Sequence, residues 1–395
     1  DAARAGATTI IALTIKLDPS VGADQVRRYG RALFFPAGQY ETSQQITIRD
    51  PGIRLIGEGA VTSVIKAQAG ITGTAVIYAQ PDGNSGSLVG HGVIGLGLDC
   101  NLQPVHGYWG EVLYDNILFD DFRISAVAGD RYGFYTARKT GHNLQVQQTI
   151  SIRKLFVAKH DQPGTVPAIY IRNCQEVLIE ESKGWNSNVA NSGSEPVWFI
   201  EDCRSLTMIE CSAANSKIGI WVHGATRSCV QISIISPLYE NVGIPLRTTA
   251  VDTTVPIDNL YHVNPRHQNA GSDGYDLDYT RLGYVETTVG PVVLGANSQT
   301  TTVLSSSRTL VTDSGSRNQI RAIRNMVDDF EYFGHNISVQ NHATGQALLQ
   351  TAIPASNETG LLVAVNRGGS ITLNKVVVGG PDSAGTGFRA LRVVN

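Results

Sequence analysis

The sequence predicts an all-β protein whose largest part is a parallel β-helix, a coil in which each turn, or rung, stacks its strands on those of the rung before it. Three observations favour this fold. Charged residues make up 16% of the chain, against about a quarter in average proteins, and glycine is frequent. Short segments of alternating apolar and polar residues, typical of half-buried strands, recur along the chain. Several of these segments align with one another as copies of a repeat.

The repeat is clearest in three neighbouring segments. "AIYIRNCQEVLIEESKGWN" (168–186) aligns with "VWFIEDCRSLTMIECSAAN" (197–215), and "GIWVHGATRSCVQISII" (219–235) gives a third copy. Fainter copies occupy 133–158 and 243–251. Each copy holds two short strands separated by a polar corner, and copies recur about every 20 to 35 residues, a period typical of solenoids. The units are too short for four-stranded propeller blades, so a parallel β-helix fits best.

Equivalent residues of successive rungs lie about 4.8 Å apart in such a coil and form columns. The alignment predicts inward columns in which Ile169, Ile171 and Cys174 lie over Trp198, Ile200 and Cys203. The five cysteines are an odd number and include no close CxxC pair, which speaks against a disulfide framework or a zinc site. The stretch "FIEDC" (199–203) is therefore predicted to be part of the structural repeat and not a motif in which the cysteine carries chemistry.

Two upstream stretches carry a resemblance to a known superfamily. "LFFPAGQYETSQQITIRDPGIRLIGEGAVTSVIKAQAG" (33–70) resembles the start of the pectate-lyase-like right-handed β-helix superfamily, and "GLGLDCN" (95–101) resembles one of its later strands. The members most similar to this chain are bacteriophage tailspikes and tail-fibre polysaccharide depolymerases. The resemblance implies a right-handed coil, a homotrimer, a place in the virion tail or outside the cell, and a bacterial surface polysaccharide, O-antigen or capsule, as partner.

The predicted organisation has three parts. Residues 1–30 form an N-terminal cap with a short helix in "DPSVGADQVRRYG" (18–30). Residues 31–290 form the β-helix, which binds glycan and carries catalysis. Residues 291–395 form a β-sandwich-like domain for trimerisation or accessory binding, because no columns can be aligned there. Caps of this kind cover the unpaired strand edges at the ends of a coil.

Composition excludes several other classes of protein. The net charge of −3 and the absence of a basic patch argue against nucleic-acid binding. No apolar stretch approaches the 18 or so residues of a membrane helix, so no membrane insertion is expected. Neither a cofactor nor a metal is predicted, since the dense acidic cluster of a calcium-dependent lyase is missing from the sequence.

The outward columns of the repeat are the predicted functional face. One column contains the aromatic residues Tyr135, Tyr170, Phe199 and Trp221. The outward column two residues along contains Ala137, Arg172, Glu201, His223 and Arg247. Aromatic rings stack on the apolar faces of sugars, while carboxylates and imidazoles handle hydroxyls and protons. These aromatics and both arginines are therefore predicted to bind a glycan; the alternative is that the rings pack under a loop or another subunit.

Three chemistries fit this face. Hydrolysis of glycosidic bonds needs two carboxyl groups, about 5 Å apart or about 6.5–9.5 Å apart. Glu201 is the first candidate, with Asp202, or with Glu195 from the polar loop 186–196, as partner, and His223 completes the catalytic set. The second chemistry is β-elimination on a uronic acid, with Arg172 or Arg247 and His223. The third possibility is a glycan receptor without catalysis. Endo-glycosidic hydrolysis is preferred.

Overall fold

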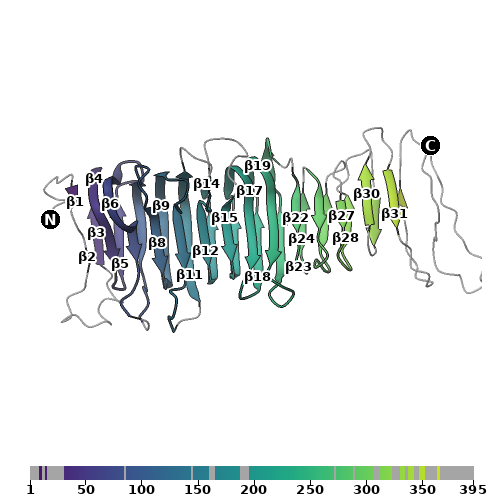
Figure 1. The fold of residues 1–395 in the computed structure, drawn as a ribbon, viewed down its shortest axis with the longest axis horizontal. Helices are drawn as coiled ribbons and strands as arrows, with labels where there is room; N and C mark the ends of the chain where they lie inside the picture. Colours follow the sequence, from purple (N-terminus) through teal and green to yellow (C-terminus); the bar gives the residue numbers. More distant parts are fainter. Residues whose placement is uncertain are drawn as a thin grey trace, which may run out of the picture.

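The computed structural model describes most of the chain between residues 31 and 322 and shorter segments on either side (Figure 1). The described residues are 9–10, 14–15, 31–83, 86–143, 146–159, 165–186, 195–270, 273–287, 290–305, 311–322, 330–333, 337–341, 347–351 and 363–364. Every regular element in these ranges is a β-strand. Figure 1 shows the strands side by side along a rod, in chain order from one end to the other.

The strands of the rod form parallel rows. Row 1, which carries the candidate site, consists of β4 (Gly38–Ile48), β6 (Ser63–Ala79), β8 (His106–Glu111), β10 (Phe134–Ala137), β12 (Ile169–Arg172), β15 (Pro196–Glu201), β17 (Ser212–Gly224), β19 (Leu238–Ala250), β22 (Tyr275–Leu277), β25 (Val292–Leu294) and β27 (Val311–Asp313). Each of these strands pairs in parallel with the next one in the row. The predicted parallel β-helix is therefore confirmed.

Two further rows complete the rungs. Row 2 consists of β3 (Arg31–Phe35), β5 (Ile53–Gly57), β7 (Gly92–Asp99), β9 (Tyr114–Val127), β11 (Gln147–Lys159), β13 (Cys174–Glu180), β16 (Arg204–Ile209), β18 (Cys229–Ile235), β20 (Ile257–Val263), β23 (Thr280–Arg281), β24 (Tyr284–Thr287), β26 (Thr302–Ser305) and β28 (Gln319–Ala322). Row 3 consists of shorter stretches. They are the first residues of β4 and β6, the last residues of β7, β9 and β11, β14 (Lys183–Trp185), the first residues of β17 and β19, and β21 (Arg266–Gln268).

The inward columns are those that the repeat predicted. Ile169 lies opposite Trp198 and Ile171 opposite Ile200, and all four side chains are buried. The side chains of the five cysteines are buried and free. Because each large apolar side chain removed from water contributes about 1.5–3 kcal/mol, this continuous core is the main source of stability of the coil.

The corner between row 1 and row 2 needs residues that tolerate a left-handed backbone. Asn173 and Asp202 occupy this corner on successive rungs with φ of 53° and 55°. Asn and Asp adopt this conformation more readily than other non-glycine residues. A second corner uses Asn215 and Asn241, and the Asn241 amide donates a hydrogen bond of 3.0 Å to the Asn215 side-chain oxygen. Polar ladders of this kind hold the corners in register.

The parallel coil extends beyond residue 290, where the sequence analysis ended it. Val285, Val303 and Ile320 lie opposite one another on β24, β26 and β28 and are buried. These strands are four residues long, and the rungs between them are shorter than the earlier ones, so the longer repeat could not be aligned to them.

The ends of the rod differ from its middle. β1 (Thr9–Ile10) and β2 (Thr14–Ile15) pair in parallel with β4, whereas the helix predicted in 18–30 lies outside the described residues. Beyond β28, the pairing becomes antiparallel in β29 (Phe330–Phe333), β30 (Ile337–Asn341), β31 (Ala347–Thr351) and β32 (Val363–Ala364). Most of the predicted C-terminal sandwich lies outside the described ranges and stays a prediction. In the segments that the structure describes, no helix is long and apolar enough to cross a membrane.

Candidate functional site

One outward column of row 1 is aromatic over six rungs. The strand register places Tyr135, Tyr170, Phe199 and Trp221 opposite one another, as the alignment predicted. Trp109, opposite Tyr135, and Tyr78, opposite Trp109, extend this column by two rungs. From Trp109 to Trp221, successive ring centroids lie 3.8, 5.1, 5.0 and 5.2 Å apart. We call the five residues from Trp109 to Trp221 the aromatic column. Tyr135 and Tyr170 are largely buried by their neighbours, while the other three rings are partly exposed.

Trp109 and Tyr132 were not among the site residues predicted from the sequence. "HGYWGE" (106–111) follows the same pattern as "YGFYTA" (132–137), and this similarity could have revealed both. The Tyr132 ring lies 5.1 Å from that of Tyr135 and 5.6 Å from that of Tyr170. Gly133 fixes this position, because a Cβ there would lie 2.1 Å from a methyl group of Val157. Tyr132 therefore widens the aromatic surface beside the column.

The second outward column carries the charged residues. Arg172 lies opposite Glu201, Glu201 opposite His223, and His223 opposite Thr249. We call these four residues the polar column. Since the rungs are about 4.8 Å apart, a ligand that touches Glu201 can also reach Arg172 and His223.

The placement of Arg247 in the polar column was wrong. Arg247 lies opposite Trp221 and continues the aromatic column. Because strand side chains alternate with a period of two, an alignment shifted by two residues keeps the outward direction but changes the column. The Arg247 guanidinium carbon lies 5.3 Å from the centre of the Trp221 ring, and its Nε lies 2.9 Å from Asp276 Oδ2. Arg247 thus stacks on the last ring of the column.

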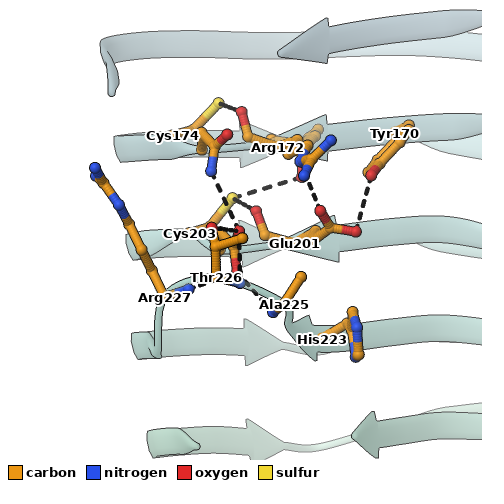
Figure 2. Close-up of polar contacts among 12 residues, drawn as sticks. Tyr170, Arg172, Cys174, Glu201, Cys203, His223, Ala225, Thr226 and Arg227 are labelled. Atoms are coloured by element: carbon orange, nitrogen blue, oxygen red, sulfur yellow. Dashed lines mark hydrogen bonds and ion pairs between the residues drawn. The ribbon is translucent and has the colours of Figure 1, made fainter. Parts of the chain in front are cut away.

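Glu201 is held between two rungs, as Figure 2 shows. Arg172 Nε lies 2.6 Å from Glu201 Oε1, and the Tyr170 hydroxyl donates a hydrogen bond of 2.9 Å to Oε2. Only 8% of the Glu201 side chain is exposed. Burial, and then the charge of Glu201, raises the pKa of Tyr170. Burial alone would lower the pKa of Arg172, but Glu201, Tyr170, Tyr135 and Asp202 together outweigh it and raise that pKa. The result is a fixed carboxylate whose charge is balanced by one arginine.

Asp202 does not join Glu201 in the site. Its buried carboxylate accepts hydrogen bonds from the backbone nitrogens of Ala225 (2.7 Å), Thr226 (3.0 Å) and Arg227 (3.1 Å) and from the Thr226 hydroxyl (2.6 Å; Figure 2). Burial alone would raise the pKa of Asp202, but the bonds from Thr226 and its neighbours lower it overall. The carboxylate points into the next corner and anchors that loop, so it is not arranged to act on a substrate.

His223 is positioned by aromatic and hydroxyl contacts. Its ring is nearly parallel to that of Phe199, with centroids 6.0 Å apart. Its Nδ1 lies 2.8 Å from the Thr249 hydroxyl, which also accepts a hydrogen bond of 2.7 Å from Trp221 Nε1. The contact at Nδ1 fixes the orientation of the ring and leaves Nε2 as the nitrogen for a ligand.

Glu195 lies at the other end of β15. The strand between Glu195 and Glu201 places their Cα atoms about 20 Å apart. Burial raises the pKa of Glu195, and Lys159 partly opposes this effect. Burial raises the pKa of Tyr132, and the charges of Glu195 and Glu201 both add to the rise. Tyr132 therefore lies within electrostatic range of both carboxylates.

The carboxyl pair expected for hydrolysis is not found within the polar column. The rungs next to Glu201 carry Arg172 and His223. Two rungs away, Thr249 occupies the same column on one side. In the described part of the chain, no group of three or more His, Cys, Asp or Glu side chains is arranged to hold a metal ion. The site is thus one carboxylate, one arginine and one imidazole beside a row of rings.

A buried lysine borders the aromatic surface. Lys159 Nζ donates hydrogen bonds to the backbone oxygens of Gly129 (3.0 Å) and Val166 (2.5 Å). Burial lowers the pKa of Lys159 to about 7, although Asp130 and Glu195 oppose the shift. Because its donors are bound to the backbone, Lys159 holds neighbouring segments together.

A coil of parallel strands that stack rung upon rung is the fold of pectate-lyase-like β-helix proteins. Residues 7–244 match the family model described as "Rhamnogalacturonase A/epimerase, pectate lyase-like", and the chain belongs to this family. The predicted resemblance to the superfamily is therefore confirmed. No curated protein sequence matches the chain.

Three solved structures illustrate the fold among viral proteins. ORF18 of Geobacillus virus E2 is 13% identical, with 91% of this chain and 74% of that chain covered and a TM-score of 0.42. The tailspike protein of E. coli bacteriophage HK620 is 13% identical, with 76% and 59% covered and a TM-score of 0.47. Gene product 12 of bacteriophage phi29, in its pre-mature form, is 13% identical, with 77% and 50% covered and a TM-score of 0.47.

Proposed function

We propose that the protein is a tailspike-type depolymerase of a virion tail, which binds a bacterial surface polysaccharide, O-antigen or capsule, and cleaves it by endo-glycosidic hydrolysis. One observation carries this proposal: the aromatic column runs beside the fixed carboxylate of Glu201. Five neighbouring rings with centroids 3.8–5.2 Å apart offer apolar surface to several successive sugar rings. Family membership agrees, since the family name refers to enzymes that act on polysaccharides.

Glu201 is the proposed base of the reaction. Its carboxylate is held in place by Arg172, at 2.6 Å, and by the Tyr170 hydroxyl, at 2.9 Å. In hydrolysis, a base takes a proton from water as the water oxygen bonds to the anomeric carbon, and an acid gives a proton to the leaving oxygen. A carboxylate fixed beside the aromatic column suits the first of these roles.

Two residues are candidates for the acid. His223 lies one rung from Glu201 in the same column, and its Nδ1 is bound to the Thr249 hydroxyl, so Nε2 is the nitrogen proposed to act on a ligand. Glu195 has a raised pKa, as a general acid requires, but about 20 Å of strand separates it from Glu201. We propose His223 as the acid, because proton transfer needs hydrogen-bond reach of the reacting group.

A second reaction, β-elimination, is favoured by one observation. The polar column has an arginine and an imidazole beside Glu201 but no second carboxylate on the adjacent rungs. Elimination needs a group that neutralises the uronate and a base that removes the neighbouring proton. Arg172 and His223 are residues of the right types.

A set of purified bacterial O-antigens and capsules tests these alternatives. Hydrolysis yields new reducing ends; elimination yields unsaturated ends that absorb in the ultraviolet; a receptor without catalysis leaves the polymer intact while still binding it. We expect reducing ends, and we expect Glu201→Gln to lower their rate of formation on the order of 100-fold or more. Replacing His223 with alanine should lower the rate while Glu195→Gln leaves it near that of the parent.

The matched control is Glu180→Gln. Glu180 pairs with Arg153 on the adjacent rung of row 2, just as Glu201 pairs with Arg172 in row 1. Glu180→Gln should leave cleavage unchanged. Cleavage by Glu201→Gln at the rate of the parent would refute the proposed role of Glu201.

A further inference from the structure

Both arginines on the outward face of the candidate site are already paired with carboxylates of the neighbouring rung. Arg172 Nε lies 2.6 Å from Glu201 Oε1, and Arg247 Nε lies 2.9 Å from Asp276 Oδ2. In both pairs the carboxylate stands directly opposite the arginine in the strand register. The cation and the anion of each pair therefore cancel within the protein.

The remaining charge on this face is negative. Glu111, at the end of β8, accepts hydrogen bonds from Trp109 Nε1 (3.0 Å) and from the Gln80 amide, both uncharged donors. The two columns and Glu111 thus contain three carboxylates against two arginines. The nearby amino group of Lys159 is buried and bound to backbone oxygens. Lys217 is exposed but lies four residues before Trp221, outside both columns.

A polyanionic glycan would bind poorly to such a surface. A uronate, sulfate or phosphate that contacts Arg172 would lie beside the carboxylate of Glu201, which is almost fully buried and already neutralises this guanidinium. Two like charges on one arginine repel each other. An uncharged sugar meets no such repulsion. It can stack on the aromatic column and exchange hydrogen bonds with the tyrosine hydroxyls and the paired carboxylates.

We infer that the glycan bound along the aromatic column is built of uncharged sugars, and that this face selects against polyuronates and other polyanions. The inference rests on the proposed function, because it assumes that the column binds a glycan. It also bears on the reaction, since β-elimination requires a uronic acid and hydrolysis does not.

The first test measures binding of the full chain to purified bacterial polysaccharides, sorted into those with uncharged and those with acidic repeat units. We expect the bound polysaccharides to be uncharged, with affinity that changes less than twofold between about 0.05 and 0.5 M salt, because screening weakens only charge attraction. Binding confined to acidic polysaccharides, or lost at high salt, would overturn the inference. Binding to neither class would instead refute the proposed function.

The second test frees one arginine and uses polygalacturonate as the probe. Asp276→Asn removes the partner of Arg247 in the site, whereas Asp258→Asn removes the partner of Arg281 in row 2, an ion pair of similar length at 2.7 Å. Gel retardation by polygalacturonate should be weak and equal in the parent and in Asp258→Asn. It should be about two- to fivefold stronger in Asp276→Asn than in that control, as expected for one exposed charge. Equal retardation of all three proteins would overturn the inference.

Discussion

Two ion pairs on different faces of the same coil show how its rows differ. In row 2, Arg153 and Glu180 lie 3.8 Å apart with 49% and 35% of their side chains exposed. In row 1, Arg172 and Glu201 lie 2.6 Å apart with 36% and 8% exposed. Both pairs join adjacent rungs, but only the second is embedded among aromatic rings. The same pairing between adjacent rungs therefore occurs in both rows. The neighbouring outward side chains determine whether such a pair lies on the open surface or within the candidate site.

The largest expected effect is the difference in stability between replacing an inward and replacing an outward residue of the same strand. Trp198 and Phe199 are neighbours on β15, but Trp198 is fully buried in the core and Phe199 is partly exposed in the aromatic column. Trp198→Ala should lower the free energy of unfolding by about 3–5 kcal/mol. Phe199→Ala should cost clearly less stability and should weaken polysaccharide binding instead. Chemical denaturation and binding assays on both variants check this, and equal losses of stability would contradict it.

The next largest effect is expected from breaking each of the two ion pairs. Arg172→Met leaves the buried carboxylate of Glu201 without its cation and should destabilise the fold by about 3 kcal/mol. Arg153→Met leaves a more exposed Glu180, so the loss should be under about 1 kcal/mol. Urea unfolding at neutral pH measures both values. Losses of similar size would mean that burial of Glu201 does not make the row 1 pair more important for stability than the row 2 pair.

A smaller effect concerns pH and a histidine inside the coil. His262 is buried, with Nε2 3.0 Å from the Tyr239 hydroxyl and Nδ1 3.0 Å from the Glu286 backbone oxygen. Burial lowers the pKa of His262 to about 3, whereas the unfolded chain has a value near 6.5. Below pH 6.5 the unfolded state therefore binds a proton at this histidine, whereas the folded state binds it only near pH 3. The free energy of unfolding consequently falls as the pH drops from about 6.5 to about 3.

The corresponding variant is His262→Gln. Between pH 7 and 4.5 it should lose about 2 kcal/mol less stability than the parent does, since this histidine no longer titrates. Unfolding free energies at the two pH values give the difference. The same pH dependence in parent and variant would show that other groups account for the acid sensitivity.

The smallest effect concerns the end of the aromatic column. Arg247→Lys keeps the charge opposite Asp276 but loses the planar group that lies 5.3 Å from the Trp221 ring centre. We expect a change in unfolding free energy below about 1 kcal/mol, together with weaker polysaccharide binding. Unchanged binding would mean that the glycan does not extend to this rung.

The sequence allowed the coil and most of its columns to be predicted, because alternation and the repeat determine which side chains point inward. The pairs Ile169 with Trp198 and Tyr170 with Phe199 follow directly from that register. The same alternation could not assign Arg247 to the correct column, because shifting the alignment of its strand by two residues leaves the side chain pointing outward. The later short rungs escaped detection because their spacing differs from that of the repeat.

The candidate site was harder to predict than the coil. Asp202 follows Glu201 directly, and only the backbone conformation at the corner, with φ of 55°, turns its carboxylate into the 225–227 loop. Tyr132 lies just before β10, outside the alternation of the strand, and reaches the site because Gly133 allows close packing. Only the similarity of "YGFYTA" to "HGYWGE" marks it in the sequence. Contacts of this kind depend on corners and loops, which period-two patterns do not describe.

The cysteines of "YIRNC" and "FIEDC" can report on local unfolding of the coil. Cys174, Cys203 and Cys229 stand at the same corner of three successive rungs, and all three thiols are reduced and buried. Burial raises the pKa of Cys203 and of Cys229, which keeps these thiols unreactive while the corner is closed. An alkylating reagent can modify them only after a rung opens. The order in which the three become labelled would therefore record the direction in which this part of the rod unravels.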